Sequence, residues 1–369
     1  MKFTVNREEL LAGIYTVEKF VPSKTPISLL SGIRFFASDD FMYLSATDLD
    51  IGIEYRFPGK IIEKGSAVLP SKILSELVRK LPAGEVSFSL DENRVTIESG
   101  GFQMVMPCFD AQDFPEIAQA EVQSVMEFPQ GLFKNNIKKV IYARAEDSVS
   151  RPYLTGVLIE CREKTLHMVA LDGFRVAWIW EKVEAGDFSV IVPGRALTEV
   201  SRIFSDGSEN FKMYLGKNRV IFRTENTVIS SRVLEGNFID YEKVVDVEPG
   251  TTVLVDTEAI SSAIERAHIL AREGSKNNLI KFRITRDLLE VSAEAEIGSL
   301  SDKLPCKTDG EELTIAFNAR FFIEALRSLD SPEVDLTFTT DTGPCIVRPR
   351  GVENHVNLIL PVKLRSDEY

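Results

Sequence analysis

The sequence predicts an α+β fold made of three copies of one unit, in which helices cover one face of antiparallel sheets. Three observations support this prediction. One helical segment is written three times with the same order of charges, a second helical segment opens each third of the chain, and a strand phrase recurs at similar intervals. Because a repeat determines the whole architecture, three markers at similar intervals outweigh any single helix or strand.

The first marker is a helix with apolar residues on one side and charges on the other. Its copies read VLPSKILSELVRKL at 68–81, IVPGRALTEVSRIF at 191–204 and IAFNARFFIEALRSL at 315–329. In the first copy, Leu74, Leu77, Val78 and Leu81 recur at helical spacing. Three charged positions coincide when the copies are superposed: Lys72, Arg195 and Arg320; Glu76, Glu199 and Glu324; Arg79, Arg202 and Arg327.

The second marker is a helix that follows a strand residue near the start of each third, at 3–17, 127–140 and 254–267. Its apolar residues fall at positions i, i+4 and i+7, which builds one apolar stripe along each helix. The three stripes are Leu10, Ile14 and Val17; Phe133, Ile137 and Val140; and Ile260, Ile264 and Ala267.

The third marker is a strand phrase at 42–57, 166–181 and, more faintly, 289–304. Asp48 and Asp172 occupy the same place in the first two copies, and the third copy has Ala295 there. Between the markers the residues alternate with period two, and the triplets DEN, SGG and GKN stand where hairpins would turn. Segments near 118–124 and 246–252 lack either period, so we expect units at 1–120, 125–246 and 250–369.

The composition describes a globular chain with a strongly acidic balance. The 369 residues are 44% hydrophobic and 27% charged, with a net charge of -13, which on average argues against a nucleic-acid partner because phosphates repel acidic surfaces. No apolar run approaches the roughly 18 residues of a membrane helix, and the opening MKFTV is not typical of a signal peptide. No cysteine pair has CxxC spacing, so we expect reduced, buried thiols in a cytoplasmic protein: Cys108, Cys161, Cys306 and Cys345.

Positive charge is nevertheless concentrated on the repeated helices. Further cations lie on the opening helices of the later units or just beyond them: Lys134, Lys138, Lys139, Arg144, Arg266 and Arg272. On a single helix such residues are readily explained as a solvated face with ion pairs worth about 0.3–0.5 kcal/mol each. Their threefold recurrence instead favours a locally attractive surface for a polyanion, with phosphate contacts that are independent of sequence and sensitive to salt.

The sequence predicts no catalytic site, cofactor or metal. His167, His268 and His355 are scattered without metal-ligand spacing, and no GxSxG, P-loop or GxGxxG motif is present. Asp48 and Asp172 are either acids of a hydrolase or acceptors of backbone hydrogen bonds at a turn, and Ala295 in the third copy favours the turn. A three-lobed protein-binding scaffold that ignores DNA is a further alternative.

The three-unit plan and six phrases resemble the bacterial sliding clamp family, the beta subunit of DNA polymerase III. These phrases are MKFTV, TDLDIGIE, DFPEI, LDGFRVA, NFIDYEKV and LILPVKL, and the resemblance covers essentially the whole chain. It implies a head-to-tail homodimer whose six units close a ring, with helices lining the hole and sheets outside. Duplex DNA would thread the hole, which tethers a replicative polymerase and makes it processive without intrinsic catalysis.

The resemblance also implies which residues meet DNA. Pro152 stands where well-known members have an aromatic residue, so the resemblance predicts no stacking at that step. The residues that match the family's DNA contacts or line the hole are Lys24, Lys72, Arg79, Lys138, Lys139, Ser148, Arg151, Tyr153, Arg195 and Arg202.

For partners, the resemblance implies an apolar pocket between the middle and last units that receives a short linear peptide from polymerases, the clamp loader and repair proteins. Ile239, Lys243 and Cys345 depart from the family's usual proline, arginine and serine, and the tail RSDEY extends past its usual end. The matching residues are Leu154, Leu171, Gly173, Phe174, Arg175, Val176, Ile239, Lys243, Val244, Cys345, Leu358, Leu360, Pro361 and Val362.

For ring closure, the resemblance implies that an edge strand within RVTIESGGFQMVM pairs with the last unit of the partner subunit. Gly101 and Gln103 stand where the family has arginines, which predicts a less ionic interface. The interface residues that it implies are Arg94, Met104 and Met106, facing Ile269, Leu270, Glu294 and Glu296.

Overall fold

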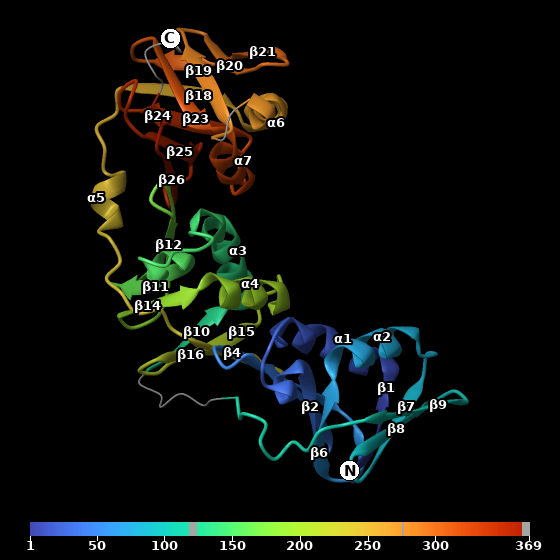
Figure 1. Cartoon of the computed structure of the whole chain (residues 1–369). Helices are drawn as coiled ribbons and strands as arrows, with labels where there is room; N and C mark the ends of the chain where they lie inside the picture. Colours follow the sequence, from blue (N-terminus) through green and yellow to red (C-terminus); the bar gives the residue numbers. More distant parts are fainter. Residues whose placement is uncertain (118–123, 275–276, 364–369) are drawn as a thin grey trace. The chain divides into compact units, whose positions relative to one another are not determined.

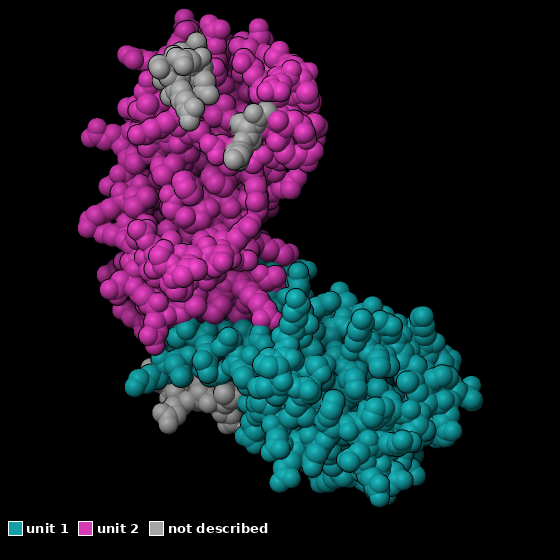
Figure 2. All heavy atoms as spheres, in the orientation of Figure 1, with its two compact units in different colours: residues 1–134, 199–233 teal, residues 135–198, 234–369 magenta. Residues whose placement is uncertain are grey.

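The computed structural model describes residues 1–117, 124–274 and 277–363 of the chain (Figure 1). The chain divides into two compact units, and each unit contains two separate stretches of sequence (Figure 2). The first unit is Met1–Lys134 with Glu199–Val233, and the second is Asn135–Thr198 with the chain from Leu234 onward. The predicted boundary at 118–124 lies outside the described residues except for its last residue. The RSDEY tail lies wholly outside them.

The first repeat has the predicted order of strand, helix, strands, helix, strands. Its two helices contact each other and cover one side of the strands (Figure 1). The elements are β1 (Lys2–Asn6), α1 (Arg7–Val17), β2 (Gly32–Ser38), β3 (Phe41–Thr47), β4 (Ile51–Pro58), β5 (Lys60–Glu63), β6 (Gly65–Pro70), α2 (Ser71–Lys80), β7 (Glu85–Asp91), β8 (Arg94–Ser99) and β9 (Phe102–Pro107).

The middle and last repeats follow the same order. The middle elements are β10 (Ser124–Pro129), α3 (Gln130–Val140), β11 (Gly156–Arg162), β12 (Thr165–Leu171), β13 (Arg175–Lys182), β14 (Phe188–Pro193), α4 (Gly194–Ile203), β15 (Asn210–Leu215), β16 (Arg219–Arg223), β17 (Thr227–Arg232) and α5 (Tyr241–Val245). The last are β18 (Thr251–Asp256), α6 (Thr257–Gly274), β19 (Leu279–Ile284), β20 (Leu288–Ala295), β21 (Gly298–Pro305), β22 (Lys307–Asp309), β23 (Leu313–Asn318), α7 (Ala319–Arg327), β24 (Glu333–Phe338), β25 (Cys345–Pro349) and β26 (His355–Ile359).

Two of the four sheets cross from one repeat to the next. In the first compact unit, β4 pairs antiparallel with β17, and Ile53 lies opposite Ile229. This pairing joins strands of the first and middle repeats in one sheet, in the order β10-β15-β16-β17-β4-β3-β2-β6. In the second, β13 pairs with β26, with Ala177 opposite Asn357, in the order β14-β11-β12-β13-β26-β25-β24-β18-β22. The middle repeat therefore contributes strands to both compact units, and the proposed division at 1–120, 125–246 and 250–369 stays a prediction.

The remaining sheets belong to the outer repeats. Their orders are β5-β1-β7-β8-β9 and β21-β20-β19-β23, so β9 and β21 are outermost strands in the described part of the chain. The turn between β8 and β9 contains Gly100 and Gly101, whose φ angles of 53° and 84° suit the left-handed conformation that a two-residue hairpin requires. This confirms the turn predicted from SGG.

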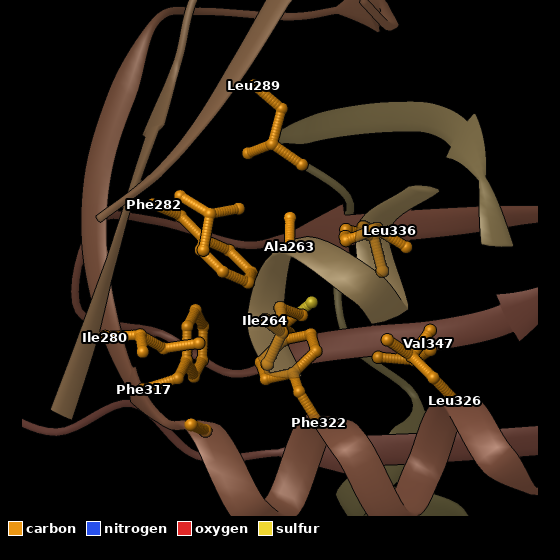
Figure 3. Close-up of a cluster of buried hydrophobic side chains, with 14 of the residues drawn as sticks. Ala263, Ile264, Ile280, Phe282, Leu289, Phe317, Phe322, Leu326, Leu336 and Val347 are labelled. Atoms are coloured by element: carbon orange, nitrogen blue, oxygen red, sulfur yellow. The ribbon is translucent and has the colours of Figure 1, made fainter. Parts of the chain in front are cut away.

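Each repeat has its own hydrophobic core, built on the predicted stripes. All nine stripe residues, from Leu10 to Ala267, are 0% exposed. Phenylalanines complete each core: Phe133 packs edge-on against Phe211, and in the last repeat Phe322 packs edge-on against Phe317 (Figure 3). Burying one such side chain contributes about 1.5–3 kcal/mol, so these clusters hold the helices on the sheets.

Side chains at the predicted starts of two helices cap them. Asn6 accepts a hydrogen bond from the backbone N–H of Glu8, at 2.8 Å, and Asn318 does the same for Arg320, at 3.0 Å. Within the described residues, no helix is both long and apolar enough to cross a membrane. The four cysteines are free thiols, of which Cys306 is half-buried and the others are buried.

Candidate functional site

The repeated charge pattern lies on α2, α4 and α7, and its two cationic positions are exposed in all three copies. The first position holds Lys72, Arg195 and Arg320, and the second holds Arg79, Arg202 and Arg327. Helical spacing explains the exposure, because these positions lie opposite the buried faces of the helices. The sequence therefore placed six cations correctly on solvent-facing sides of three equivalent helices.

The acid between the cations is used differently in each copy. Glu199 accepts a hydrogen bond from Arg202 at 2.7 Å, and Glu324 accepts one from Arg320 at 3.0 Å. In the first copy, Arg79 instead contacts Glu18, in the turn after α1, at 3.0 Å. Because the arginines are more than half exposed, these pairs hold the side chains in place and leave their charge accessible to solvent.

The two adjacent lysines on α3 have different environments. Lys138 is exposed, whereas the Lys139 side chain is only 16% exposed and its Nζ lies 2.9 Å from Asp330 Oδ2. Lys134 is also engaged, donating to the Phe204 carbonyl at 3.0 Å. Of these three cations, Lys138 is the one with its charge directed to solvent.

The predicted DNA-contacting loop is partly folded against the protein. Ser148 Oγ accepts a hydrogen bond from the Arg151 backbone N–H at 3.1 Å. Arg151 is exposed, whereas Tyr153 is half-buried and packs edge-on against Phe238. Lys24 is exposed in the loop after α1. A DNA-contacting role for each of these residues stays a prediction.

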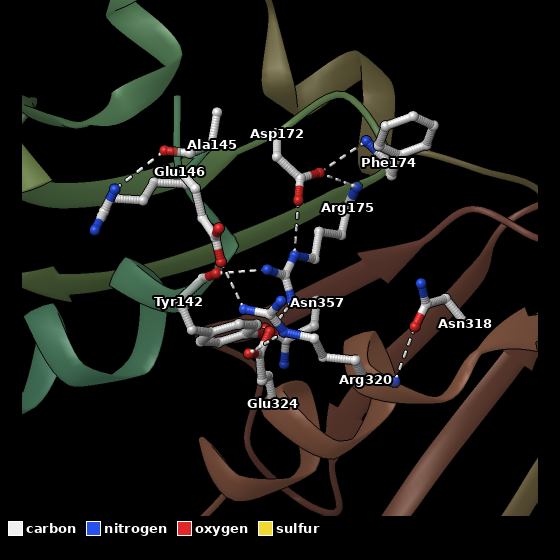
Figure 4. Close-up of polar contacts among 11 residues, drawn as sticks. Tyr142, Ala145, Glu146, Asp172, Phe174, Arg175, Asn318, Arg320, Glu324 and Asn357 are labelled. Atoms are coloured by element: carbon white, nitrogen blue, oxygen red, sulfur yellow. Dashed lines mark hydrogen bonds and ion pairs between the residues drawn. The ribbon is translucent and has the colours of Figure 1, made fainter. Parts of the chain in front are cut away.

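A buried guanidinium links the middle and last repeats inside the second compact unit (Figure 4). Arg175, at the start of β13, is 6% exposed and contacts Asp172 at 3.0 Å and the Glu324 carboxylate. It also donates to the Tyr142 carbonyl at 2.7 Å and lies over the Phe321 ring at 4.5 Å. A buried charge is stable only when it is paired with an opposite charge and hydrogen-bonded, and the Arg175 guanidinium meets both conditions.

Tyr142 extends this network toward β26. Its hydroxyl donates to Asn357 Oδ1 at 2.6 Å, and burial raises the pKa of the Tyr142 phenol above its ordinary value. Arg320 binds Glu146 at 2.7 Å, and that hydrogen bond lowers the pKa of the Glu146 carboxyl. No sequence pattern predicted the Tyr142–Asn357 and Arg320–Glu146 contacts, because their members are far apart along the chain.

The Asp48 and Asp172 carboxylates accept backbone hydrogen bonds at equivalent turns. Asp48 accepts from the N–H groups of Asp50 and Ile51, at 3.0 and 2.9 Å. Asp172 accepts from Phe174 and Arg175, at 2.9 and 3.1 Å. This is the turn-forming alternative predicted from sequence. Each strand phrase that contains these turns folds as two paired strands.

The residues of the predicted peptide pocket gather around β13, α5 and β26. Leu154, Leu171, Val176 and Leu358 are buried in one hydrophobic cluster. Four apolar side chains of the set are exposed beside it: Phe174, Ile239, Val244 and Leu360. The buried residues therefore form the base of the predicted pocket, and the four exposed side chains form its apolar contact surface.

Local contacts fix the exposed members of this set. The Phe174 carbonyl accepts from the Leu360 N–H at 2.8 Å, which ties the β12–β13 turn to the end of β26. Phe174 stacks on Phe321, an aromatic residue that the sequence reasoning missed. Gly173 has a φ of 94°, a conformation that favours glycine. Lys243 forms an exposed ion pair with Asp240 at 2.7 Å, and Cys345, Pro361 and Val362 are at least partly buried.

The short helix α5 is held by an aromatic and charged cluster on the sheet. The Tyr241 hydroxyl donates to Glu160 at 2.6 Å, and Arg162 donates to the same hydroxyl. His167 accepts from the Trp178 indole at 3.2 Å, so this histidine serves a structural hydrogen bond. Burial lowers the pKa of His167, which keeps its ring neutral near neutral pH. These contacts position the α5 residues Lys243 and Val244.

The predicted interface residues lie at or near free strand edges. Arg94 is exposed on β8, Met104 is half-buried on β9 and Met106 is buried. Ile269 and Leu270 lie on α6, with Ile269 65% exposed. Glu294 and Glu296 are exposed at the end of β20 and in the turn that follows. The outermost strand there is β21, which the sequence reasoning did not single out.

Among the described residues, no group of three or more histidine, cysteine or acidic side chains is arranged to hold a metal ion. The site that the geometry offers is thus a set of surfaces: exposed cations on three equivalent helices, apolar side chains beside β13 and β26, and the outermost strands β9 and β21. Such surfaces on a threefold α+β repeat define a repeat-built binding protein of the clamp class.

Comparisons with known proteins agree along the whole chain. Models of the DNA polymerase III beta subunit match its N-terminal domain to residues 1–118, its central domain to 127–240 and its C-terminal domain to 243–363. The beta sliding clamp of Bacillus subtilis (strain 168) is 33% identical over 378 aligned positions, which cover 98% of this chain and 100% of that protein.

Solved structures give the same answer. The DNA polymerase sliding clamp from Bacillus subtilis matches with a TM-score of 0.94 at 32% identity, covering 99% of this chain and 100% of that one. A putative DNA polymerase III beta subunit from Eubacterium rectale matches with a TM-score of 0.93 at 31% identity, with the same coverage. The chain belongs to the DNA polymerase III beta subunit family, the sliding clamps. It is accordingly an accessory processivity subunit and not itself a catalyst.

Proposed function

We propose that this protein encircles duplex DNA as a head-to-tail homodimer and tethers a replicative polymerase to it. The observation that carries the proposal is the set of six exposed cations on α2, α4 and α7, at two equivalent positions per helix. Because the protein has a net charge of -13, isolated cations would not attract a polyanion. Cations that recur at equivalent positions of the three repeats create a local attraction for one. In a dimer the number of such helices doubles.

The proposed DNA contact is made to phosphates and not to bases. Lysine and arginine contacts to the backbone carry no sequence information, so they permit movement along the duplex. Exposed contacts of this kind are Lys24, Lys72, Arg79, Lys138, Arg151, Arg195 and Arg202, with Lys139, Ser148 and Tyr153 in supporting positions. Retention would then come from topology, and the phosphate contacts would only centre the duplex.

The proposed partner site is the apolar surface of Phe174, Ile239, Val244 and Leu360 above its buried support. A short linear peptide from a polymerase, a clamp loader or a repair protein would place apolar side chains there. A few well-packed anchor side chains supply most of the binding energy in a typical interface. The proposal places the protein in the cytoplasm, with the bacterial chromosome.

Ring closure is proposed to use the outermost strands β9 and β21. Strand β9 would align with β21 of the partner subunit, since both present unpaired backbone groups at the edge of a sheet. This interface is heterologous, because it joins two different surfaces of the protein. Two copies then close a ring, since each copy contributes three repeats. The side chains of Met104 and Ile269 would be covered on closure.

The decisive experiment compares circular with linear DNA. The full-length protein is loaded on a nicked circular plasmid by the cognate clamp loader with ATP and passed over a gel-filtration column. Encirclement predicts that protein stays with the circle and is lost when a restriction enzyme cuts the plasmid. Equal retention on both forms would contradict the proposal and favour a protein that binds DNA along a groove, and no retention on either would favour the scaffold alternative.

A further inference from the structure

The sheet that joins the first and middle repeats carries charged side chains on the face turned away from α1. Leu44 of β3 meets Gly13 of α1, and successive strand residues point to opposite faces, so Ser45 and its cross-strand neighbours lie on the other face. The register of the strands gives two rows on that face. They are Arg34, Ser45, Glu54, Val228, Arg223, Lys212 and Glu127, and beside them Phe36, Tyr43 and Arg56.

Three arginines of this face lie over aromatic rings and not beside acids. Their guanidinium carbons lie 5.2–5.6 Å from the ring centroids, in the pairs Arg34 with Phe36, Arg56 with Phe41 and Arg223 with Tyr214. Among the described residues these three arginines form no ion pair with a carboxylate. A guanidinium that rests on a ring keeps its charge available to an anion.

The balance of charge in the two rows is positive, although the chain as a whole is strongly acidic. The rows hold four cations, of which Arg223 and Lys212 are exposed, and two acids. Glu127 accepts a hydrogen bond from Asn210 at 2.9 Å. Burial raises the pKa of Glu54, against the opposing effect of the Arg34 and Arg223 charges, which weakens its ionised form. The face therefore presents a local attraction for an anion.

The internal repeat shows what this face does in the second compact unit, where it is apolar and covered. With Asp48 superposed on Asp172, the places of Arg34, Ser45, Glu54 and Arg56 are taken by Leu158, Val169, Trp178 and Trp180. These four residues pack in one hydrophobic cluster with Tyr241 and Val245 of α5. In the second unit, a helix of the chain itself is thus seated on the face.

The first unit replaces that apolar seat with arginines and polar side chains. In the described part of the connection after β9, Phe114 packs in a small cluster with Val68 and Ala111, and Ile117 lies beside Gly52. Both contacts are apolar, and they leave Arg223 and Lys212 exposed further along the face. The equivalent face of the first unit is therefore chemically suited to a ligand that is anionic and not apolar.

We propose that this face of the first compact unit binds single-stranded nucleic acid, independently of base sequence. Its phosphates would contact the cations, and its bases would stack on the arginine–aromatic pairs, because guanidinium planes and aromatic rings both accept bases. Arg34 and Arg223 stand four strand spacings apart, about 19 Å at about 4.8 Å per strand, so the ligand is a segment of several nucleotides and not a mononucleotide. An acidic peptide would satisfy the charges but offers no flat group for the rings. The site is separate from the helix cations and does not depend on encirclement of a duplex.

The test measures fluorescence anisotropy of a labelled oligothymidylate with the full-length protein at several salt concentrations. Arg223→Gln and Lys212→Gln each remove an exposed cation and should each reduce the slope of log affinity against log salt by about 0.7. Arg348→Gln is the matched control. Arg348 is exposed at the equivalent position of the second unit, where its cross-strand neighbour is Asp335, whereas that of Arg223 is Lys212. It should leave binding of the oligonucleotide unchanged.

Photocrosslinking locates the bound strand. An oligonucleotide that carries 5-iododeoxyuridine should crosslink to Tyr214, Phe36, Phe41 or Tyr43, as read by mass spectrometry of the digested protein. Crosslinks confined to α2, α4 and α7 would place the strand on the helix cations and overturn the proposal. Equal salt slopes for Arg223→Gln and Arg348→Gln, or no binding of the oligonucleotide, would also overturn it.

A glutamate-rich peptide of equal charge tests the other class of polyanion. Tighter binding of this peptide than of the oligonucleotide, lost in Arg223→Gln, would assign the face to an acidic protein segment and overturn the proposal. Arg223→Gln should not change retention on the circular plasmid, so failure of this inference and failure of encirclement give different results.

Discussion

The Lys139 ammonium lies 2.9 Å from the Asp330 carboxylate, and this contact joins α3 to the segment after α7 within the second compact unit. The adjacent Lys138 faces solvent. Two neighbouring lysines in the proposed DNA-contacting set thus have different physical roles, and this difference can be measured.

We expect Lys138→Ala to weaken DNA binding and Lys139→Ala to weaken the fold. Loss of one phosphate contact reduces the slope of log affinity against log salt by about one, whereas loss of the Lys139–Asp330 pair leaves that slope unchanged. DNA binding measured at several salt concentrations checks the first effect. Tryptophan fluorescence during urea unfolding checks the second, because both tryptophans of the chain, Trp178 and Trp180, lie in the second compact unit. A reduced salt slope for Lys139→Ala would contradict this assignment.

Arg175→Met should destabilise the second compact unit strongly. The substitution leaves the Asp172 and Glu324 carboxylates without their shared cation in a mostly buried setting, a loss of about 3–5 kcal/mol. Arg350→Ala is the matched control, since its ion pair with Asp335 at 3.0 Å is formed by an arginine that is 56% exposed, and such pairs contribute about 0–1 kcal/mol. Urea unfolding followed by tryptophan fluorescence compares them, and similar midpoints for the two variants would show that the Arg175 network is not structural.

His355 should make stability depend on pH in the acidic range. Burial, with a smaller effect of the nearby Lys139 charge, lowers the pKa of His355 from 6.5 to about 4. Below pH 6.5 the His355 side chain therefore binds a proton in the unfolded chain. In the folded protein it does so only near pH 4 and below. The free energy of unfolding should fall by about 3 kcal/mol as the pH drops through this window, and should depend less on pH below it.

His355→Asn serves as the control for this pH effect, since asparagine carries no titratable proton. In tryptophan-monitored unfolding at pH 4.5, 5.5 and 7, the variant should lose less stability on acidification than the unaltered protein. An unchanged slope in the variant would assign the pH dependence to other groups.

Val105→Asp should prevent dimer formation. Val105 is 51% exposed on β9, and a carboxylate there would be desolvated by a strand added to this edge. Ile62→Asp places the same charge on β5, at the opposite edge of the same sheet, where Ile62 is 55% exposed. Sedimentation equilibrium at micromolar concentration should give a monomer for the first variant and a dimer for the second. Monomers of the unaltered protein under these conditions would rule out a stable ring.

Leu360→Ala should weaken binding of a partner peptide about tenfold, which corresponds to about 1.4 kcal/mol. Leu360 is 39% exposed at the end of β26, beside the Phe174 backbone that its N–H contacts. Val352→Ala removes a similarly exposed side chain, also 39%, from a loop outside the proposed surface. Fluorescence polarisation with a labelled peptide from the cognate replicative polymerase should separate the two variants. Equal losses would place the peptide elsewhere.

The sequence by itself determined the repeat, the two helices of each unit and their buried stripes, because helical periodicity and charge order are local properties. It also supported the turn-forming role of Asp48 and Asp172, since an acid three residues before a strand can bond its own backbone. The exposed cations Lys72, Arg195 and Arg320 followed from the same helical geometry.

Only the tertiary structure decided which strands join the repeats and which lysine of α3 is paired. The pairings of β4 with β17 and of β13 with β26, and the contact of Lys139 with Asp330, connect residues far apart along the chain. Local periodicity says which side of an element is apolar, but the choice of partner depends on how complete surfaces fit and which charges they bury together. For that reason the repeats look alike in sequence, while the β13–β26 junction buries the charged Arg175 and the β4–β17 junction buries Ile51 at the equivalent position.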